Sequence, residues 1–290
     1  MPVVAWPPSL VERIAANQWV LFVGSGVSAS CTNHAGGSPP TWEGLLTTLC
    51  ALIADHAHRT TGEQLIAGRD FLAAADHIRY SLANEARLSS YQQSIRLAVE
   101  GPAGDKFVPS TLFDALLNLE PKIVFTTNYD KLFEIASTSG FRTHQVNSPD
   151  LSDDLRLGEP VLVKLHGSTD AINHIILTRT DYASVTKTGR DVFDALRALS
   201  LTSTFLFVGY SLEDPDIQLV LQAVGRPGMS PEAHFMLAPE PESPSRMPVF
   251  KESFGVSVLA YPAGHHSQVE VAIRELGDLV LGARTGSAPR

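Results

Sequence analysis

Short apolar runs recur along the chain, and longer amphipathic stretches separate them. Each run carries hydrophobic residues on both of its alternating faces, which is typical of strands covered by helices on both sides. The runs span residues 19–24, 122–127, 161–167, 204–210, 234–238 and 256–261. Helical patterns between them include 41–57, 110–119, 130–138, 191–200 and 267–282. Strands that alternate with helices predict an α/β fold with a doubly wound, mostly parallel sheet.

The interval between the first two strands departs from simple alternation. Nearly all of its apolar spacing is helical, with patterns over 41–57, about 69–82 and about 85–99. We therefore expect a helical insertion over approximately 41–119, within one domain that covers residues 1–290. The polar, small residues of 283–290 predict a flexible C-terminal tail.

Charge and cysteine content exclude several classes of function. The formal net charge is −9, and no run of Lys or Arg exceeds two residues, which argues against direct nucleic-acid binding. Cys31 and Cys50 are the only cysteines, so neither a disulfide framework nor a four-thiolate zinc site can form. No apolar stretch is long enough to cross a membrane, and the N-terminal residues do not have a signal-peptide pattern. We expect a cytoplasmic protein without a metal.

In an open parallel sheet, ligands bind outside the carboxyl ends of the strands, so residues after each apolar run are the candidates. The first run ends in Gly24-Ser25-Gly26-Val27-Ser28-Ala29, which satisfies G-x-G-x-x-[G/A]. Glycines at Gly24 and Gly26 allow a tight turn and a close approach of the backbone to a pyrophosphate. A tight strand-to-loop turn without a ligand fits the same stretch. Glu43 has the spacing of a ribose-binding carboxylate but lies in a helical pattern.

The second and third strand ends carry polar side chains. Thr126, Asn128 and Asp130 follow the strand at 122–127, where an amide and a carboxylate could hold a sugar hydroxyl, a water or a polar ligand group. Capping of the next helix by Asn128 or Asp130 is the alternative. His166 stands before Gly167 at the end of the third run, and an imidazole with a pKa near 6.5 suits a general base. A core histidine bonded to a backbone carbonyl is the alternative there.

The fourth strand end contains Gly209 and Ser211, where Gly209 permits a close approach and the Ser211 hydroxyl can bind a phosphate or ribose. The following Asp214-Pro215 pair also fits the start of a helix. Asp181 and Tyr182, after a predicted strand at 174–178, are most simply the start of another helix.

Together and in this order, the four segments resemble the sirtuin-like NAD-binding family. The residues that carry the resemblance are Gly24, Gly26, Ser28, Thr126, Asn128, Asp130, His166, Gly167, Gly209 and Ser211. The stretches "GSGVSAS…PPTWEGLL" and "KLHGS…IILTRTDY" look like the divergent prokaryotic branch, which is commonly an NAD hydrolase in defence against phage.

The resemblance implies a Rossmann-like sheet with NAD, as substrate, across the strand ends. It implies that the loop of Gly24, Ser25, Gly26 and Ser28 holds the pyrophosphate, with Thr126 and Asp130 among the binding residues and Asp130 at the nicotinamide end. Asn128 would orient the nicotinamide ribose or the attacking water, and His166 would be the general base. Gly209 and Ser211 would line the adenosine side.

The chain also departs from the family. Sirtuin deacylases carry a zinc module with four cysteines, which two cysteines cannot build, so zinc is not expected. Trp42 and Glu43 stand where the family has a Phe-Arg pair. Trp42 either covers the nicotinamide pocket or anchors a helix in the core.

These observations predict an NAD hydrolase that releases nicotinamide and ADP-ribose. Nicotinamide leaves NAD as a neutral ring, so cleavage mainly needs positioning and support for a cationic transition state. The alternatives are an NAD-dependent deacylase or ADP-ribosyltransferase, and a module that binds NAD or ADP-ribose without turnover. Family analogy implies control by homo-oligomerisation or by a separately encoded sensor, such as an ATPase or a nucleic-acid-guided protein, with residues 41–100 as the candidate contact surface.

Overall fold

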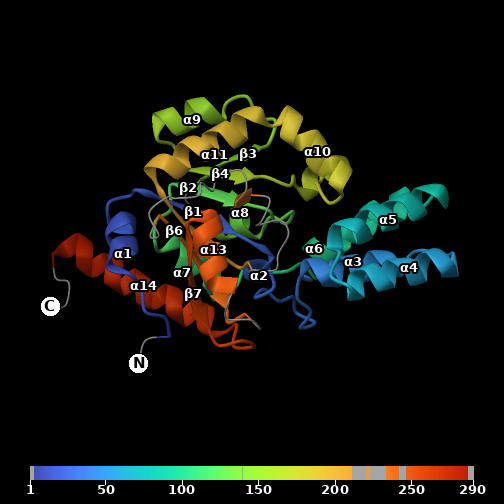
Figure 1. Ribbon diagram of the computed structural model, residues 1–290, viewed down its shortest axis with the longest axis horizontal. Coiled ribbons are helices and arrows are strands. Elements are labelled where there is room, and N and C mark those ends of the chain that lie inside the picture. Colours follow the sequence, from blue (N-terminus) through green and yellow to red (C-terminus); the bar gives the residue numbers. More distant parts are fainter. Residues whose placement is uncertain (1–2, 139, 211–219, 222–232, 242–245, 287–290) are drawn as a thin grey trace.

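A computed structural model describes residues 3–138, 140–210, 220–221, 233–241 and 246–286 (Figure 1). Within these residues, seven strands form one sheet in the order β3-β4-β2-β1-β5-β6-β7, and every neighbouring pair is parallel. The strands are β1 (Trp19–Val23), β2 (Ile123–Thr126), β3 (Arg142–Gln145), β4 (Val161–Lys164), β5 (Thr204–Val208), β6 (His234–Pro239) and β7 (Val256–Tyr261). The predicted doubly wound α/β fold is confirmed.

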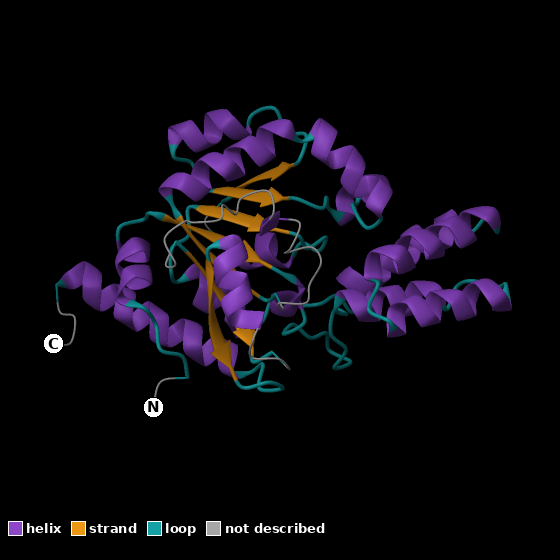
Figure 2. Ribbon diagram, viewed as in Figure 1, coloured by secondary structure: helices purple, strands orange, loops and turns teal. Residues whose placement is uncertain are grey.

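Helices cover both faces of the sheet (Figure 2). They are α1 (Pro8–Ala15), α2 (Ser25–Ser28), α3 (Trp42–Cys50), α4 (His56–Ala67), α5 (Phe71–Asn84), α6 (Leu88–Glu100), α7 (Thr111–Leu117), α8 (Leu132–Ala136), α9 (Leu151–Leu157), the 3-10 helix η1 (Thr169–His174), α10 (Arg179–Thr188), α11 (Arg190–Thr202), α13 (Arg246–Phe254) and α14 (Gln268–Thr285). Among the described residues, no helix has both the length and the apolar character that a membrane crossing needs.

Strand β1 shows how the apolar runs build this core. Leu21 and Val23 pack on one side with buried residues of α1, α7 and α14, while Val20 and Phe22 pack on the other with residues of α9 and α11. Because side chains alternate along a strand, a run that is apolar at every position must be covered on both faces. All five residues of β1 are accordingly buried.

Helices α3 to α6 form a separate bundle, here called the helical lobe, which projects away from the sheet (Figure 1). The lobe has its own buried cluster, with Leu46, Leu49 and Ile78 among the fully covered side chains. It lies in the chain between β1 and β2, where the helical insertion is predicted. The carboxyl ends of β2 and β4 point toward it (Figures 1 and 2).

Four details differ from the sequence expectations. The helix expected over 41–57 is two helices, because Asp55 accepts a hydrogen bond from His58 N (2.8 Å) and starts α4. The segment 174–178 is the end of η1 and a loop rather than a strand. Strand β3 was not predicted from the apolar pattern, because an edge strand can be polar. Helix α14 continues to Thr285, three residues into the predicted tail.

The order of the strands indicates where a ligand is expected to bind. The chain moves from β1 to β2 on one side of the sheet and later returns to add β5 on the other side of β1. This reversal is a topological switch point, where ligands bind in open α/β sheets. The loops after β1, β2 and β5 therefore meet at one edge.

Candidate functional site

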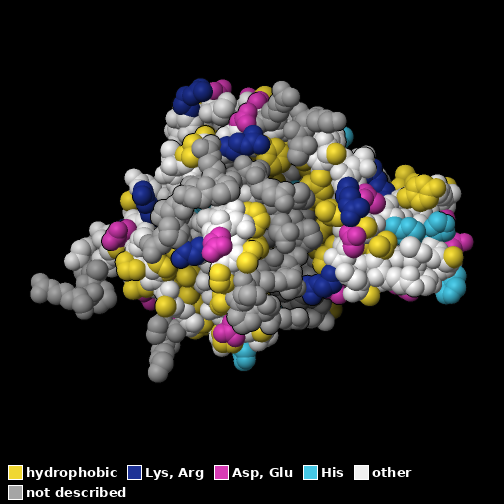
Figure 3. All heavy atoms as spheres, viewed as in Figure 1, with side chains coloured by type: hydrophobic (Ala, Val, Ile, Leu, Met, Phe, Trp, Pro, Cys, Tyr) yellow, Lys and Arg dark blue, Asp and Glu magenta, His cyan; other side chains and the backbone are white. Residues whose placement is uncertain are grey.

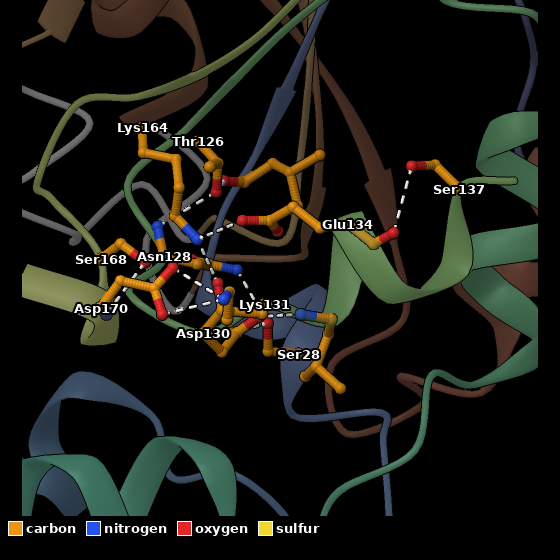
Figure 4. A network of polar contacts seen from close by, with 12 residues as sticks. Ser28, Thr126, Asn128, Asp130, Lys131, Glu134, Ser137, Lys164, Ser168 and Asp170 are labelled. Carbon is orange, nitrogen blue, oxygen red and sulfur yellow. Dashed lines mark hydrogen bonds and ion pairs between the residues drawn. The ribbon is translucent and has the colours of Figure 1, made fainter. Parts of the chain in front are cut away.

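Three buried side chains, one from the short helix α2 and two from the loop after β2, form a hydrogen-bonded relay (Figure 4). Asn128 Nδ2 donates to Gly24 O (3.0 Å) and to Ser28 Oγ (2.8 Å). Ser28 Oγ donates in turn to Asp130 Oδ2 (2.7 Å). The structure thus brings together residues that the sequence assigned to two separate strand ends.

The end of β2 sets this geometry. Thr126 Oγ1 donates to Val23 O (2.8 Å), which ties the ends of β2 and β1 together, and accepts from Asn128 N (3.0 Å). Asp130 Oδ1 accepts from Leu132 N (3.0 Å) at the start of α8. One oxygen of Asp130 therefore supports the start of α8, which was the alternative role for this residue. The other oxygen accepts the hydrogen bond from Ser28 in the relay.

The carboxyl group of Asp130 lies in an unusual environment. Burial raises its pKa above the ordinary value, although the nearby Lys164 ammonium and the Ser28 hydroxyl both oppose this shift. Lys164 is 1% exposed, donates to Asp130 O and pairs with Glu134 Oε1 at 3.0 Å. Sequence reasoning assigned Lys164 no role, although a lysine inside an apolar run was the available signal.

The three glycines of the site serve the packing of two loops. Gly24 N donates to Val208 O and Gly26 N to Gly209 O, both over 2.9 Å. A Cβ atom on Gly24 would lie 2.6 Å from Gly209 O, and one on Gly209, at φ +82°, would lie 2.6 Å from Val27 N. The glycines are thus required where the loops after β1 and β5 touch each other. Their role in binding a pyrophosphate stays a prediction.

Two adjoining cavities open beside this relay. The larger has a volume of about 620 Å³, within the range of ligand pockets, and lies over the ends of β1, β5 and β7. The smaller has a volume of about 50 Å³ and is lined by Ser28, Asn128 and Asp130. Three residues line both cavities: Ser25, Thr41 and Trp42.

Trp42 performs the structural role considered for it and also reaches the cavities. Its half-buried ring meets Phe71 edge-on, with a centroid distance of 5.7 Å, inside the lobe cluster. The neighbouring Glu43 and Arg69 line the larger cavity, as does Gly209, whereas Ser211 lies outside the described residues.

His166 is buried just after the end of β4. Leu165 N donates to Thr126 O (2.8 Å), which holds the ends of β4 and β2 together. The His166 ring meets Tyr182 at a right angle, with a centroid distance of 5.1 Å, and lies 6.5 Å from the ring of Tyr129. It is not among the residues that line the two cavities.

Across the described part of the chain, no three His, Cys, Asp or Glu side chains are grouped so that they could hold a metal ion. On the face shown in Figure 3, the described Lys and Arg side chains are scattered among acidic ones rather than gathered into a stripe.

Comparisons with known proteins find sirtuin-like relatives of this chain. Residues 122–259 match the SIR2-like domain. The chain is 30% identical over 112 residues to the NAD(+) hydrolase ThsA of Enterococcus faecium, covering 38% of this chain and 23% of that protein. It is 24% identical over 217 residues to the ThsA of Acinetobacter baumannii, covering 74% and 41% of the two chains. It is 26% identical over 116 residues to Defense-associated sirtuin 2 of Bacillus subtilis, covering 39% and 12%.

The matched segments thus span less than half the length of these curated relatives. A solved Sir2 enzyme chain aligns over 93% of this chain and 96% of its own, with 17% identity and a TM-score of 0.47. The predicted resemblance to the sirtuin-like family is confirmed by the domain match.

Proposed function

We propose that this sirtuin-like chain is an NAD hydrolase, which breaks the bond between nicotinamide and ribose and releases nicotinamide and ADP-ribose. The orientation of Asn128 carries the proposal. Both hydrogens of its amide are donated, to Gly24 O and Ser28 Oγ, so the carbonyl oxygen is the polar atom left for a ligand in the small cavity. A carbonyl oxygen there can accept a hydrogen bond from a water or a ribose hydroxyl.

The two cavities suggest how NAD lies. The adenosine and pyrophosphate would occupy the larger cavity, against Ser25, Gly26 and Gly209. The nicotinamide end would point toward the relay, past Trp42. The small cavity has room for only a few water molecules, so the loop of residues 39–42 must move when a nicotinamide ring enters.

The proposed reaction needs few chemical groups from the protein. The C1′–N bond breaks and its electron pair passes to the nicotinamide, which leaves as a neutral ring. Water then bonds to C1′, and His166, as general base, takes its proton directly or through the ribose hydroxyls. Asn128 orients the water, and the buried relay keeps this side chain in a single orientation, which lowers the cost of reaching the transition state.

The relatives' names support a role in defence, since they include "NAD(+) hydrolase ThsA" and "Defense-associated sirtuin 2". We propose that the chain depletes NAD in response to phage, in the cytoplasm, under the control of homo-oligomerisation or of a separately encoded sensor protein. The use of NAD by a deacylase or ADP-ribosyltransferase remains an alternative, which acyl-peptide dependence of NAD consumption would identify.

The position of His166 favours a second candidate. Because His166 lines neither cavity, the described arrangement also suits a module that binds NAD without turnover. Calorimetry with NAD, together with assays for nicotinamide, separates the two functions.

The experiment is to incubate the purified full chain with NAD and to measure nicotinamide by chromatography. We expect release by the wild type, and at least a hundredfold slower release by Asn128→Ala and His166→Ala. Arg156→Ala is the control, because its guanidinium pairs with Asp153 on an exposed helix face, with 78% of the Arg156 side chain accessible. Equal release by the wild type and by both site variants would contradict the proposed hydrolase.

A further inference from the structure

The helical lobe is hydrogen-bonded to the segment that carries His166. Arg96 Nη2, on α6, donates to Thr169 O (2.9 Å), and Gln92 Nε2 donates to Asn173 Oδ1 (2.7 Å). Both acceptors belong to η1, which begins three residues after His166. Ile175 and Leu177, just beyond η1, are buried in the lobe's own apolar cluster.

Helix α5 of the lobe holds the far end of the same segment through one carboxylate. Arg79 Nη1 donates to Asp181 Oδ1 over 2.6 Å. The other oxygen, Asp181 Oδ2, accepts from Thr178 N (3.0 Å) and Thr178 Oγ1 (2.8 Å) in the capping box that starts α10. The lobe and the first turn of α10 therefore share Asp181.

A second arginine strengthens this junction. Arg179 Nη2 pairs with Asp70 Oδ1 at 2.9 Å, and Arg179 N donates to Asp76 Oδ1 over 3.1 Å. Asp70 caps α5, and Asp76 lies within that helix. Both the backbone and the side chain of Arg179 therefore bind helix α5 at the start of α10. Because of these contacts, a movement of α5 is transmitted to α10.

The residue after Asp181 touches the predicted general base. The ring of Tyr182 meets the His166 imidazole at 90° with a centroid distance of 5.1 Å. An edge-to-face pair of this kind has a preferred geometry, so the Tyr182 ring restricts the orientation of the imidazole. Since Tyr182 lies in the first turn of α10, its place follows from the contacts of Asp181 and Arg179 with α5.

We propose that Tyr182 is a positioning residue for His166, and that the Arg79–Asp181 pair makes this position depend on the helical lobe. The lobe is then the regulatory element of the site: a partner or second copy that shifts α5 against α10 moves Tyr182 and, with it, His166. This inference rests on the proposed hydrolase function. It adds the route by which control reaches the reaction.

The test uses the full chain and two pairs of variants. Arg79→Ala removes the link to the lobe, and Arg79→Lys keeps a positive charge within reach of Asp181. Tyr182→Leu removes the ring, and Tyr182→Phe keeps it. Arg156→Ala removes an exposed pair outside the junction and serves as the control. Circular dichroism melting curves confirm that each variant is folded.

Two readouts are measured. Nicotinamide release gives kcat and KM, and the ¹³Cε1 resonance of His166 at one fixed pH, assigned with His166→Asn, reports the surroundings of the imidazole without any turnover. We expect Arg79→Ala and Tyr182→Leu to lower kcat about ten- to a hundredfold, with KM changed less than about threefold, and to shift the His166 resonance. The conservative variants Arg79→Lys and Tyr182→Phe should keep most of the wild-type kcat and leave the His166 resonance close to its wild-type position.

Unchanged His166 resonances in Arg79→Ala and Tyr182→Leu would overturn the proposal, as would an unchanged kcat in both variants. If the activated wild type itself releases no nicotinamide, the proposed hydrolase fails, while the resonance still decides whether the lobe positions His166.

Discussion

Ser28 Oγ donates a 2.7 Å hydrogen bond to Asp130 Oδ2 although 102 positions separate the two residues in the chain. Ser28 ends the short helix after β1, and Asp130 follows β2. Both side chains are buried, so the bond is shielded from competing water and connects the two loops directly. Asn128 depends on the same hydroxyl for one of its two acceptors.

The first prediction concerns this hydroxyl. Ser28→Ala should lower the free energy of unfolding by about 1–3 kcal/mol, because it leaves buried polar groups without their partner. Nicotinamide release should fall at least about tenfold, since the Asn128 amide is no longer held. Urea denaturation and the release assay measure both effects. Ser137→Ala, which removes a half-buried bond to Glu134 O, is the control; equal losses in the two variants would refute the special role of Ser28.

The raised pKa of Asp130 predicts a pH effect on stability. Above the ordinary pKa of 3.8, the unfolded chain releases this proton while the folded protein still holds it. The contribution of Asp130 to the free energy of unfolding therefore falls as the pH rises from 3.8 through the raised folded pKa. Urea denaturation over this range should show Asp130→Asn gaining stability relative to the wild type. Exposed Asp153→Asn is the control, and a flat difference for Asp130→Asn would contradict the prediction.

His234 predicts a pH effect of opposite sign. Burial lowers its pKa from 6.5 to about 4, and its Nδ1 accepts from Phe205 N (3.2 Å). As the pH falls from 6.5 toward 4, the unfolded chain gains a proton that the folded protein excludes, and about 3 kcal/mol of stability is lost. His234→Asn keeps an acceptor for Phe205 N but does not titrate, so its stability should depend less on pH over this window. The exposed His56→Asn is the control.

Gly209 tests the contact between the loops after β1 and β5. Gly209→Ala combines a positive φ of +82° with a Cβ atom 2.6 Å from Val27 N. Gly264→Ala is a matched control, because Gly264 has a φ of +77° but nothing within 4 Å of the added atom. The control should cost about 1–2 kcal/mol for the backbone conformation, and Gly209→Ala at least about 1–3 kcal/mol more for the clash. Equal losses in urea denaturation would show that the loops separate freely.

Lys164 tests the ion pair between its buried ammonium and the half-buried Glu134. Lys164→Met should lower the free energy of unfolding by about 3 kcal/mol, because Glu134 and Asp130 O lose a partner that is 1% exposed. Lys131→Met is the control, since Lys131 pairs with Asp170 at the surface and should cost at most about 1 kcal/mol. Adding Glu134→Leu to Lys164→Met should restore part of the stability. A smaller loss for Lys164 than for Lys131 would contradict this account.

The fold was open to prediction because its central strands are covered on both sides. Runs such as 19–24 and 204–210 are apolar at nearly every position, which is typical of strands covered on both faces. Strand β3 lacked this signal, because its place at the sheet edge leaves Arg142 and Thr143 exposed. Besides the Asp55 cap, the break between α3 and α4 is held by Glu85, which lies 30 or so positions further along the chain and accepts from Ala54 N and Asp55 N.

By itself, the sequence determined the parallel α/β sheet and the polar residues at its strand ends, including Ser28, Asn128, Asp130 and His166. The spacing of apolar residues and the local sequence motifs contain that information. Only the tertiary structure decided that Ser28 links Asn128 to Asp130, that Gly209 packs on the loop of Gly24, and that Tyr182 meets His166. Such contacts depend on which strands become neighbours and on how the lobe packs against α10, and the free energy of those long-range contacts is not encoded in any short stretch of residues.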